Sequence, residues 1–150
     1  MIIDISSNET IDTTCLDAVA RSVLGNKTVG VSVMVGLSRI HITDASDQST
    51  AETIFNNWGS LTVTADKTVM DEGDADPVVT CNDASISSDS DVNYIVLLDG
   101  DVYASGTTTV TAGEATLNLV SPVDGVYEIF MYRTTGNYAS GSVTITVSEV

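Results

Sequence analysis

The stretch that decides the fold is DGVYEIFMYR, residues 124–133. It opens on an Asp-Gly turn signal and continues with β-branched and aromatic residues, which are typical of a strand. Side chains alternate between the two faces of a strand, so Tyr127, Ile129 and Met131 should share one face and the residues between them the other. We therefore predict a central strand over residues 126–133, with Ile129 in the core.

Around this strand, residues 61–150 show Thr-rich alternation broken by polar turns about every 8–12 residues. Seven short strands are predicted, over residues 61–65, 78–81, 93–98, 102–104, 115–119, 126–133 and 142–147. Among the turns between them, Asp99-Gly100-Asp101 is interpreted as a tight hairpin and Ser105-Gly106 as a second turn. This pattern favours a β-sandwich over a barrel or an α/β fold.

Residues 1–60 have a different pattern, which predicts a small α+β unit. Ile11, Cys15, Val19 and Val23 recur every four residues and predict a helix over residues 10–24. Strands are predicted over residues 1–5, 28–35 and 37–43, with Ser6-Ser7 ending the first of them. The spacing of Ser49-Thr50-Ala51-Glu52 is that of a capping box, which predicts a second helix ending near residue 57.

The chain of 150 residues carries 21 acidic residues against five Lys and Arg, a formal charge of −16. Such a surface repels phosphate backbones and anionic lipid, so we expect neither a nucleic-acid nor a membrane partner. Residues 61–150 hold fourteen acids and two bases, and residues 1–60 hold seven acids and three bases. The sandwich is therefore expected to be the more solvated of two domains, residues 1–60 and residues 61–150.

The first residues and the two cysteines bear on the compartment of the protein. Residues 1–5 lack the basic segment and the long apolar run of a secretory signal, so we expect no signal peptide. Cys15 lies in a helical pattern and Cys81 in a strand pattern. We interpret both as small buried hydrophobes rather than as a disulfide.

Two acidic segments are the candidate metal ligands. Asp71, Asp74 and Asp76 lie in one loop, and Asp89 and Asp91 in another. Clustered carboxylates suit calcium, although the spacing matches no calcium-loop motif. The alternative is a solvated acidic rim that aids solubility, and we expect no cofactor.

No catalytic constellation is evident in the sequence. His41 is the only histidine, and no Gly-x-Ser-x-Gly turn, phosphate-binding glycine loop or zinc-ligand spacing occurs. A histidine-dependent nucleophile would need His41, because no other side chain supplies that base. We therefore predict that the protein is not an enzyme.

The aromatic residues permit a second, non-catalytic role. Amphipathic rings suit the faces of sugars, and the chain offers Trp58, Tyr94, Tyr103, Tyr132 and Tyr138. The alternative is that these rings pack in the core and on the sheets. Tyr138, in the Gly-flanked loop of residues 134–141, is the candidate for a surface contact.

Three segments resemble bacterial and phage immunoglobulin-like domains. They are the entry LTVTADKT (residues 61–68), the corner DGVY (residues 124–127) and the closing strand GSVTITV (residues 141–147). The resemblance implies that Tyr127 is the tyrosine corner of such a domain, its hydroxyl bonded to nearby backbone. No second cysteine pairs with Cys81 and no Trp lies on the third strand, so antibody-like recognition is not implied.

This resemblance also implies a class of role. In phages, such domains are appended to capsid, tail and decoration proteins. The expectation is a non-enzymatic virion protein, a capsid decoration or cement protein, in which residues 1–60 contact other virion proteins and copies of the same chain. The alternative is a glycan-binding or cell-surface-binding module on a tail or cell surface, with host glycans as partners.

Overall fold

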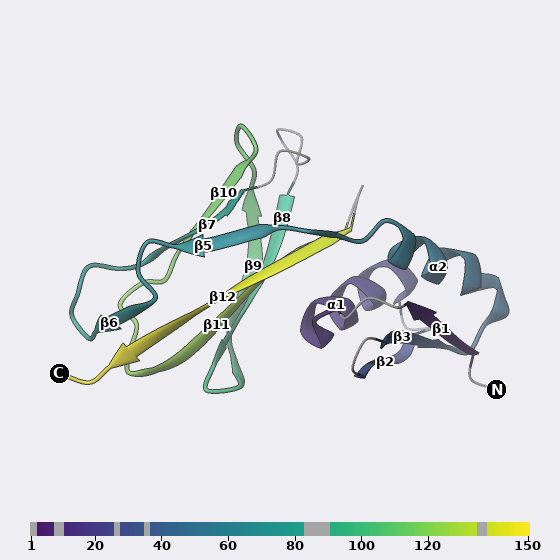
Figure 1. Ribbon diagram of the computed structural model, residues 1–150, viewed down its shortest axis with the longest axis horizontal. Coiled ribbons are helices and arrows are strands. Elements are labelled where there is room, and N and C mark those ends of the chain that lie inside the picture. The colour runs from purple at the N-terminus through teal and green to yellow at the C-terminus, as the bar shows by residue number, and fades with distance from the viewer. Residues whose placement is uncertain (1–2, 8–10, 26–27, 35–36, 83–90, 135–137) are drawn as a thin grey trace. The chain divides into compact units, whose positions relative to one another are not determined.

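The computed structural model describes residues 3–7, 11–25, 28–34, 37–82, 91–134 and 138–150 (Figure 1). The chain forms two compact units. The first unit is Met1–Gly59 together with Arg133–Ser140, and the second is Ser60–Tyr132 together with Gly141–Val150. The chain therefore passes from one unit to the other at three points. The sequence prediction had placed all of residues 61–150 in the sandwich.

The first unit has a three-stranded antiparallel sheet and two helices (Figure 1). The sheet order is β1-β3-β2, and these strands are β1 (Ile3–Ser7), β3 (Leu37–Ile42) and β2 (Thr28–Met34). The helices are α1 (Thr13–Leu24) and α2 (Gln48–Asn56), the second preceded by a 3-10 turn, η2 (Ala45–Asp47). Residues 1, 2 and 35 of the predicted strands lie outside the described residues.

Helix α1 begins where a carboxylate satisfies its free backbone N–H groups. Asp12 accepts hydrogen bonds from the backbone N–H groups of Thr14, at 2.9 Å, and Cys15, at 3.2 Å. This N-cap places the start of the helix at Thr13 rather than at the predicted residue 10. The predicted stripe faces the core in part: Cys15 and Val19 are buried in α1, together with Leu16, Ala20 and Leu24.

Two predictions in the first unit are wrong. Ser49 does not cap α2, because the helix already begins at Gln48 and no side chain caps its N-terminus. Glu52 instead accepts a hydrogen bond from the side-chain amide of Gln48 at 3.2 Å. Ser6 and Ser7 continue β1, where they pair with Arg39 and Ser38, because a strand partner outweighs their weak turn preference.

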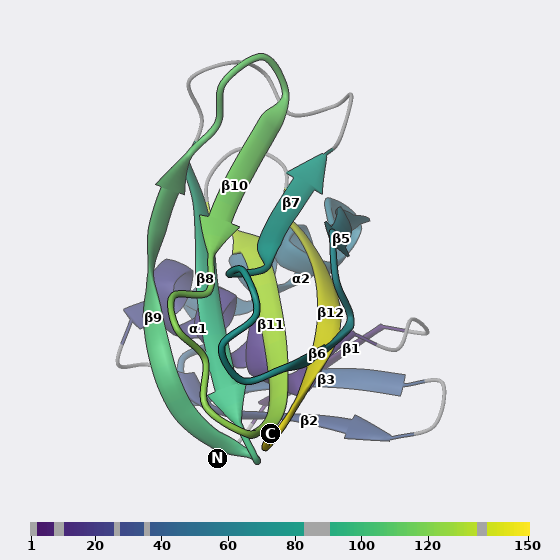
Figure 2. The same ribbon diagram turned by 90° about the vertical axis from the view of Figure 1, so that its left-hand side faces the viewer.

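The second unit is a β-sandwich, as predicted (Figure 2). One sheet has the order β10-β7-β5, with β10 (Glu114–Asn118), β7 (Val78–Asn82) and β5 (Thr62–Ala65). The other has the order β4-β12-β11-β8-β9, with β4 (Gly59–Ser60), β12 (Ala139–Ser148), β11 (Gly125–Arg133), β8 (Asp91–Leu98) and β9 (Asp101–Thr109). The short strand β6 (Val69–Asp71) pairs in parallel with β12. Consecutive strands are thus shared between the two sheets, since β5, β7 and β10 lie in one and β8, β9, β11 and β12 in the other.

Strand β11 supplies the centre of the sandwich core, and its predicted parity is confirmed. Tyr127, Ile129 and Met131 are fully buried on one face. From the strands on either side of the core, the buried residues include Val79, Cys81, Val92, Val96, Ala115, Ile145 and Val147. The corner predicted from the resemblance is present, because the Tyr127 hydroxyl donates to the carbonyl of Val123 at 3.0 Å.

Of two turns predicted in the second unit, one is confirmed and the other is wrong. Asp99 and Gly100 have φ of 51° and 91° and form the two-residue connection between β8 and β9, as predicted. The prediction of a turn at Ser105-Gly106 is wrong, because β9 continues through these residues to Thr109. A Cβ at Gly106 would lie 2.7 Å from the hydroxyl oxygen of Tyr94, so the glycine admits that ring instead of making a turn.

Strand β6 was missed and β8 begins earlier than predicted. The alternation of residues 69–71 is too short to predict a strand. Their partners in β12 lie 77 positions later in the sequence, as in the pair Val69 and Thr146. Asp91, placed in an acidic loop by the sequence, is the first residue of β8. Its companion Asp89 lies outside the described residues.

Candidate functional site

Carboxylates hold several loops of this protein together. Among the described residues, acidic side chains accept hydrogen bonds from backbone N–H groups at distances of 2.6–3.2 Å: Asp12, Asp44, Asp66, Glu72, Asp74, Asp76 and Asp99. A hydrogen bond to an ionised acceptor is stronger than one between neutral groups. Part of the large negative charge therefore stabilises loops and turns by accepting backbone hydrogen bonds.

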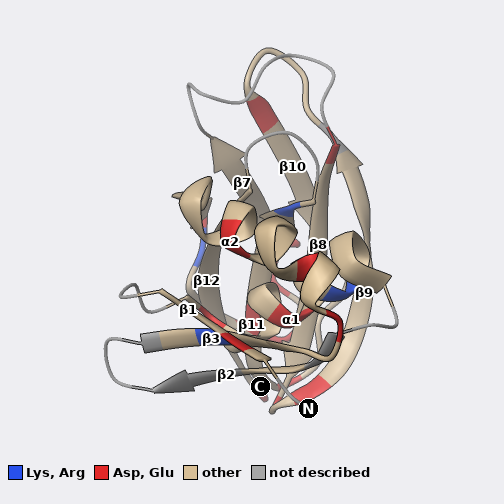
Figure 3. Cartoon of the chain, turned by 90° about the vertical axis from the view of Figure 1, so that its right-hand side faces the viewer, with Lys and Arg blue, Asp and Glu red and all other residues tan. Residues whose placement is uncertain are grey.

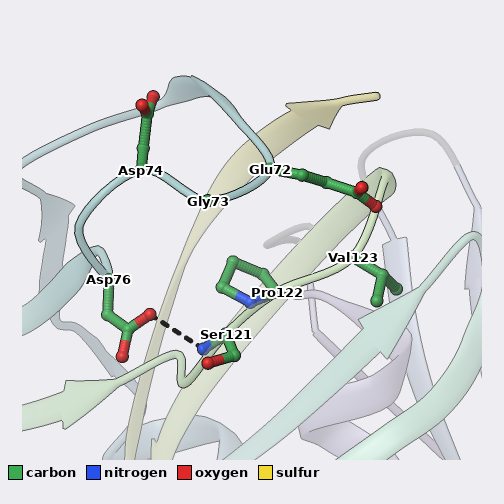
Figure 4. A pocket seen from close by; sticks show the side chains of 7 residues that line it. All are labelled: Glu72, Gly73, Asp74, Asp76, Ser121, Pro122 and Val123. Carbon is green, nitrogen blue, oxygen red and sulfur yellow. Dashed lines mark hydrogen bonds between the residues drawn. The ribbon is translucent and has the colours of Figure 1, made fainter. Parts of the chain in front are cut away.

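One pocket of the second unit lies between the loop of residues 72–76 and the loop of residues 121–123 (Figure 4). This pocket of about 310 Å³ is lined by residues 72–74 and 76 of one loop and by Ser121, Pro122 and Val123 of the other. The backbone N–H of Ser121 donates to Asp76 at 2.8 Å, and that of Asp124 donates to Glu72 at 2.6 Å. The two loops are thus joined by acceptors on the first and donors on the second.

Two of the three calcium candidates accept hydrogen bonds from different backbone groups. Asp74 accepts from the backbone N–H of Asp71 at 3.0 Å, while Asp76 bonds to Ser121. Figure 4 shows Asp74 and Asp76 pointing in different directions. Within the described residues, no three His, Cys, Asp or Glu side chains come together as a metal-ligand set. The structure therefore does not gather Asp71, Asp74 and Asp76 around one point.

His41 lies on the polar face of the first unit's sheet. Its Nδ1 is 2.6 Å from a carboxylate oxygen of Asp4, its cross-strand neighbour. Ile40 and Ile42, on the other face of β3, are fully buried. Cys15 is buried within helix α1, on a different element. The geometry thus gives His41 a carboxylate partner and no cysteine beside it.

Both cysteines are buried thiols rather than a disulfide, as the sequence predicted. Burial, together with the nearby Asp12 carboxylate, raises the pKa of the Cys15 thiol to about 12 from an ordinary value of 9.0. A nucleophilic cysteine needs the thiolate, which requires a lowered pKa. Cys15 is therefore a packing residue and an inert thiol at neutral pH.

The raised pKa of Cys15 predicts that the free energy of unfolding falls at alkaline pH. Because the folded-state pKa is raised, the unfolded chain releases its proton first, and stability falls as pH rises from about 9 toward about 12. At pH 11 the expected loss from Cys15 is about 3 kcal/mol. We expect urea denaturation to show the difference between the native chain and Cys15→Ala shrinking by that amount between pH 8 and pH 11. An unchanged difference would contradict the prediction.

The aromatic residues are mostly packed. All eight lie in the described part of the chain, and Tyr103, at 46%, is the one with an exposed side chain. Even its ring is engaged, edge-on against Tyr127 with centroids 5.4 Å apart. Tyr138 is half-buried, and its carbonyl accepts a hydrogen bond from Gly59 at 2.8 Å. A surface contact through Tyr138 stays a prediction.

Sequence reasoning missed the second wall of the pocket and two arginines. Ser121 has a φ of 44°, which nothing in its local sequence indicates. Arg133 is 7% exposed, and its Nε, like that of Arg39, has no hydrogen-bond partner among the described residues. The alternation of β11 could have found Arg133, because it has the same parity as Tyr127 and Met131.

The Asp99 carboxylate allows a matched test of loop capping. It accepts from the backbone N–H of Val126 at 2.9 Å, and its own φ is positive. Asp99→Ala should therefore lower the free energy of unfolding by about 1–2 kcal/mol. Asp99→Asn should cost much less, since its amide oxygen accepts the same bond and Asn tolerates this backbone conformation. Urea denaturation measures both.

The neighbouring Asp101 provides the control for this test. It is exposed and has the same charge, so Asp101→Ala changes the net charge equally without removing a loop contact. Equal losses of stability for Asp99→Ala and Asp101→Ala would refute the capping role.

Comparison with known proteins gives only distant similarities. No family model and no curated protein matches the chain. Neither described helix is long and apolar enough to cross a membrane. Three solved structures are similar at 15% identity each.

These structures are of different kinds. A polysaccharide lyase has a TM-score of 0.45, with 77% of this chain and 16% of that one covered. The CARDB domain of a Pyrococcus furiosus protein, in complex with di-metal ions, has a TM-score of 0.37, with 59% and 90% covered. Superoxide reductase (neelaredoxin) from Ignicoccus hospitalis has a TM-score of 0.39, with 60% and 81% covered. Similarities this distant carry over no activity, metal or substrate.

Proposed function

We propose that this chain is a non-enzymatic structural protein of a phage virion, a capsid decoration or cement protein. The observation that carries the proposal is a β-sandwich whose Tyr127 hydroxyl bonds to the Val123 carbonyl, as the resemblance to phage immunoglobulin-like domains implies. Such domains are appended to capsid, tail and decoration proteins, and the second unit would be the appended domain of this chain.

The side chains that could do chemistry support a non-enzymatic role. The Cys15 thiol has a raised pKa, His41 faces Asp4, and the acidic loop side chains accept backbone hydrogen bonds. Catalytic groups are instead placed so that one activates another at a site open to substrate. The Cys15 thiol thus packs in the core, and the Asp74 and Asp76 carboxylates fix loop geometry.

The two units would divide the work on the particle. The second unit, with a formal charge of −13, is the part that we propose faces solvent (acidic residues are red in Figure 3). Strong like charge keeps neighbouring copies of such a domain from associating nonspecifically. The first unit, with a formal charge of −3, would make the contacts with other virion proteins.

Electron cryomicroscopy of phage particles that encode this chain would test the proposal. We expect density for the chain at symmetry-related positions, with residues 1–59 against the shell and the sandwich pointing outward. Particles without such density would refute the virion role. Density with the sandwich against the shell would refute the division of work. A glycan array gives the competing outcome, since hits that are lost in Tyr138→Ala would support the glycan-binding alternative.

A further inference from the structure

Strand β9 is an open edge of the larger sheet. In the sheet order β4-β12-β11-β8-β9 its one partner among the described strands is β8 (Figure 2). With nine residues, it is as long as the central strand β11. An edge strand presents unpaired backbone N–H and C=O groups, which are a template for a further strand.

This edge lacks the charges that usually protect such strands. Residues 102–113 contain no Asp, Glu, Lys or Arg, and no proline, in a chain with a formal charge of −16. Asp101, the one charged residue of β9, is the first residue of the strand and lies at its turn, and the next charged residue along the chain is Glu114, at the start of β10. Natural proteins commonly block exposed edges with charge or proline, so the neutral run along β9 needs another reason.

The open part of β9 is short and regular. Tyr103 is an extra residue at a β-bulge, because Val96 faces Ala104 while Leu97 faces Val102. At the far end, the Thr108 hydroxyl donates to the carbonyl of Thr116 in β10 at 3.0 Å. Between these two features, residues 104–107 have no strand partner other than β8 within the described part of the chain. The exposed side chains of Val102, at 71%, and Tyr103, at 46%, lie next to this opening.

We propose that β9 pairs with β9 of a second copy of this chain in an antiparallel, two-fold arrangement. Antiparallel pairing of one strand with itself is self-complementary, as a two-fold interface requires. Within residues 102–107, no register sets two charged side chains against each other.

Net charge favours a second copy over a foreign strand. Two chains with a formal charge of −16 repel each other over most of their surface. An uncharged edge is where such copies can approach, whereas a basic foreign partner would gain more from the acidic loops. The proposal does not rest on the virion role.

Sedimentation of the full chain over a range of concentration and salt tests the proposal. We expect a monomer–dimer equilibrium that strengthens as salt rises, because salt screens the repulsion between copies. Ser105→Glu adds a carboxylate in the middle of the open segment and should weaken the dimer about tenfold or more. Thr64→Glu, an equally exposed site on β5 with the same change in charge, should weaken it less than about twofold.

Hydrogen exchange provides a readout that does not depend on substitution. The amides of residues 104–107 should exchange more slowly as the concentration of the native chain rises. A native chain that stays monomeric at every salt concentration would overturn the proposal. So would equal effects of the two variants, a dimer lost only in Thr64→Glu, or protection of β9 that appears only when another protein is added.

Discussion

Gly141→Ala is expected to lower the free energy of unfolding by about 3 kcal/mol. Gly141 lies in β12, and a Cβ at this position would clash with the backbone carbonyl oxygen of Leu61 and lie 2.9 Å from Cγ2 of Val63. A side chain can rotate away, but a backbone carbonyl moves only with its strand. The added methyl group therefore requires β12 and the entry to β5 to separate, which disturbs the junction between the two sheets.

Gly30→Ala is the matched control for this substitution. Gly30 lies in β2, with no heavy atom within 4 Å of the position of an added Cβ and with an ordinary φ. Alanine there should be neutral or stabilising by less than about 1 kcal/mol, since it restricts the unfolded chain. Urea denaturation of both variants measures the difference. Losses of similar size at the two positions would show that the close approach at Gly141 is not what destabilises.

Local patterns predicted those parts of the fold whose determinants lie close together in sequence. The alternation of β11 placed Tyr127 and Ile129 in the core, and Asp99-Gly100 predicted a hairpin, because each signal is complete within a few residues. The turn expected at Gly106 failed for a non-local reason. The ring that requires the glycine belongs to Tyr94, twelve residues earlier on the neighbouring strand.

The same distinction applies to the candidate site. The acidic loop was evident from composition, but its hydrogen-bond donors are not near it in the sequence. Asp76 bonds to Ser121, 45 residues later, and Glu72 to Asp124, 52 residues later. A cluster of carboxylates predicts calcium and loop capping equally well until the donors are placed. Only the fold shows that backbone N–H groups take up these oxygens.

Tyr127→Ala is expected to cost about 4 kcal/mol, a large share of the 5–15 kcal/mol typical of a domain. Tyr127 is fully buried, stacks edge-on against Tyr103 and bonds through its hydroxyl to the Val123 carbonyl. The alanine variant loses the ring, its contacts and this bond together. Tyr127→Phe removes the hydroxyl alone and should cost about 1–2 kcal/mol.

Comparing the substitutions separates the corner hydrogen bond from the packing of the ring. Tyr103→Ala removes the other ring of the stacked pair, but Tyr103 is 46% exposed, so its loss should cost less than about half that of Tyr127→Ala. The double variant should cost less than the sum of the two, because the stacking can be lost only once. If Tyr127→Phe alone costs as much as Tyr127→Ala, the hydroxyl is the main contribution and the ring is replaceable. If Tyr127→Phe costs nothing, Tyr127 is a core residue whose hydroxyl makes no net contribution, and the tyrosine corner does not stabilise this sandwich.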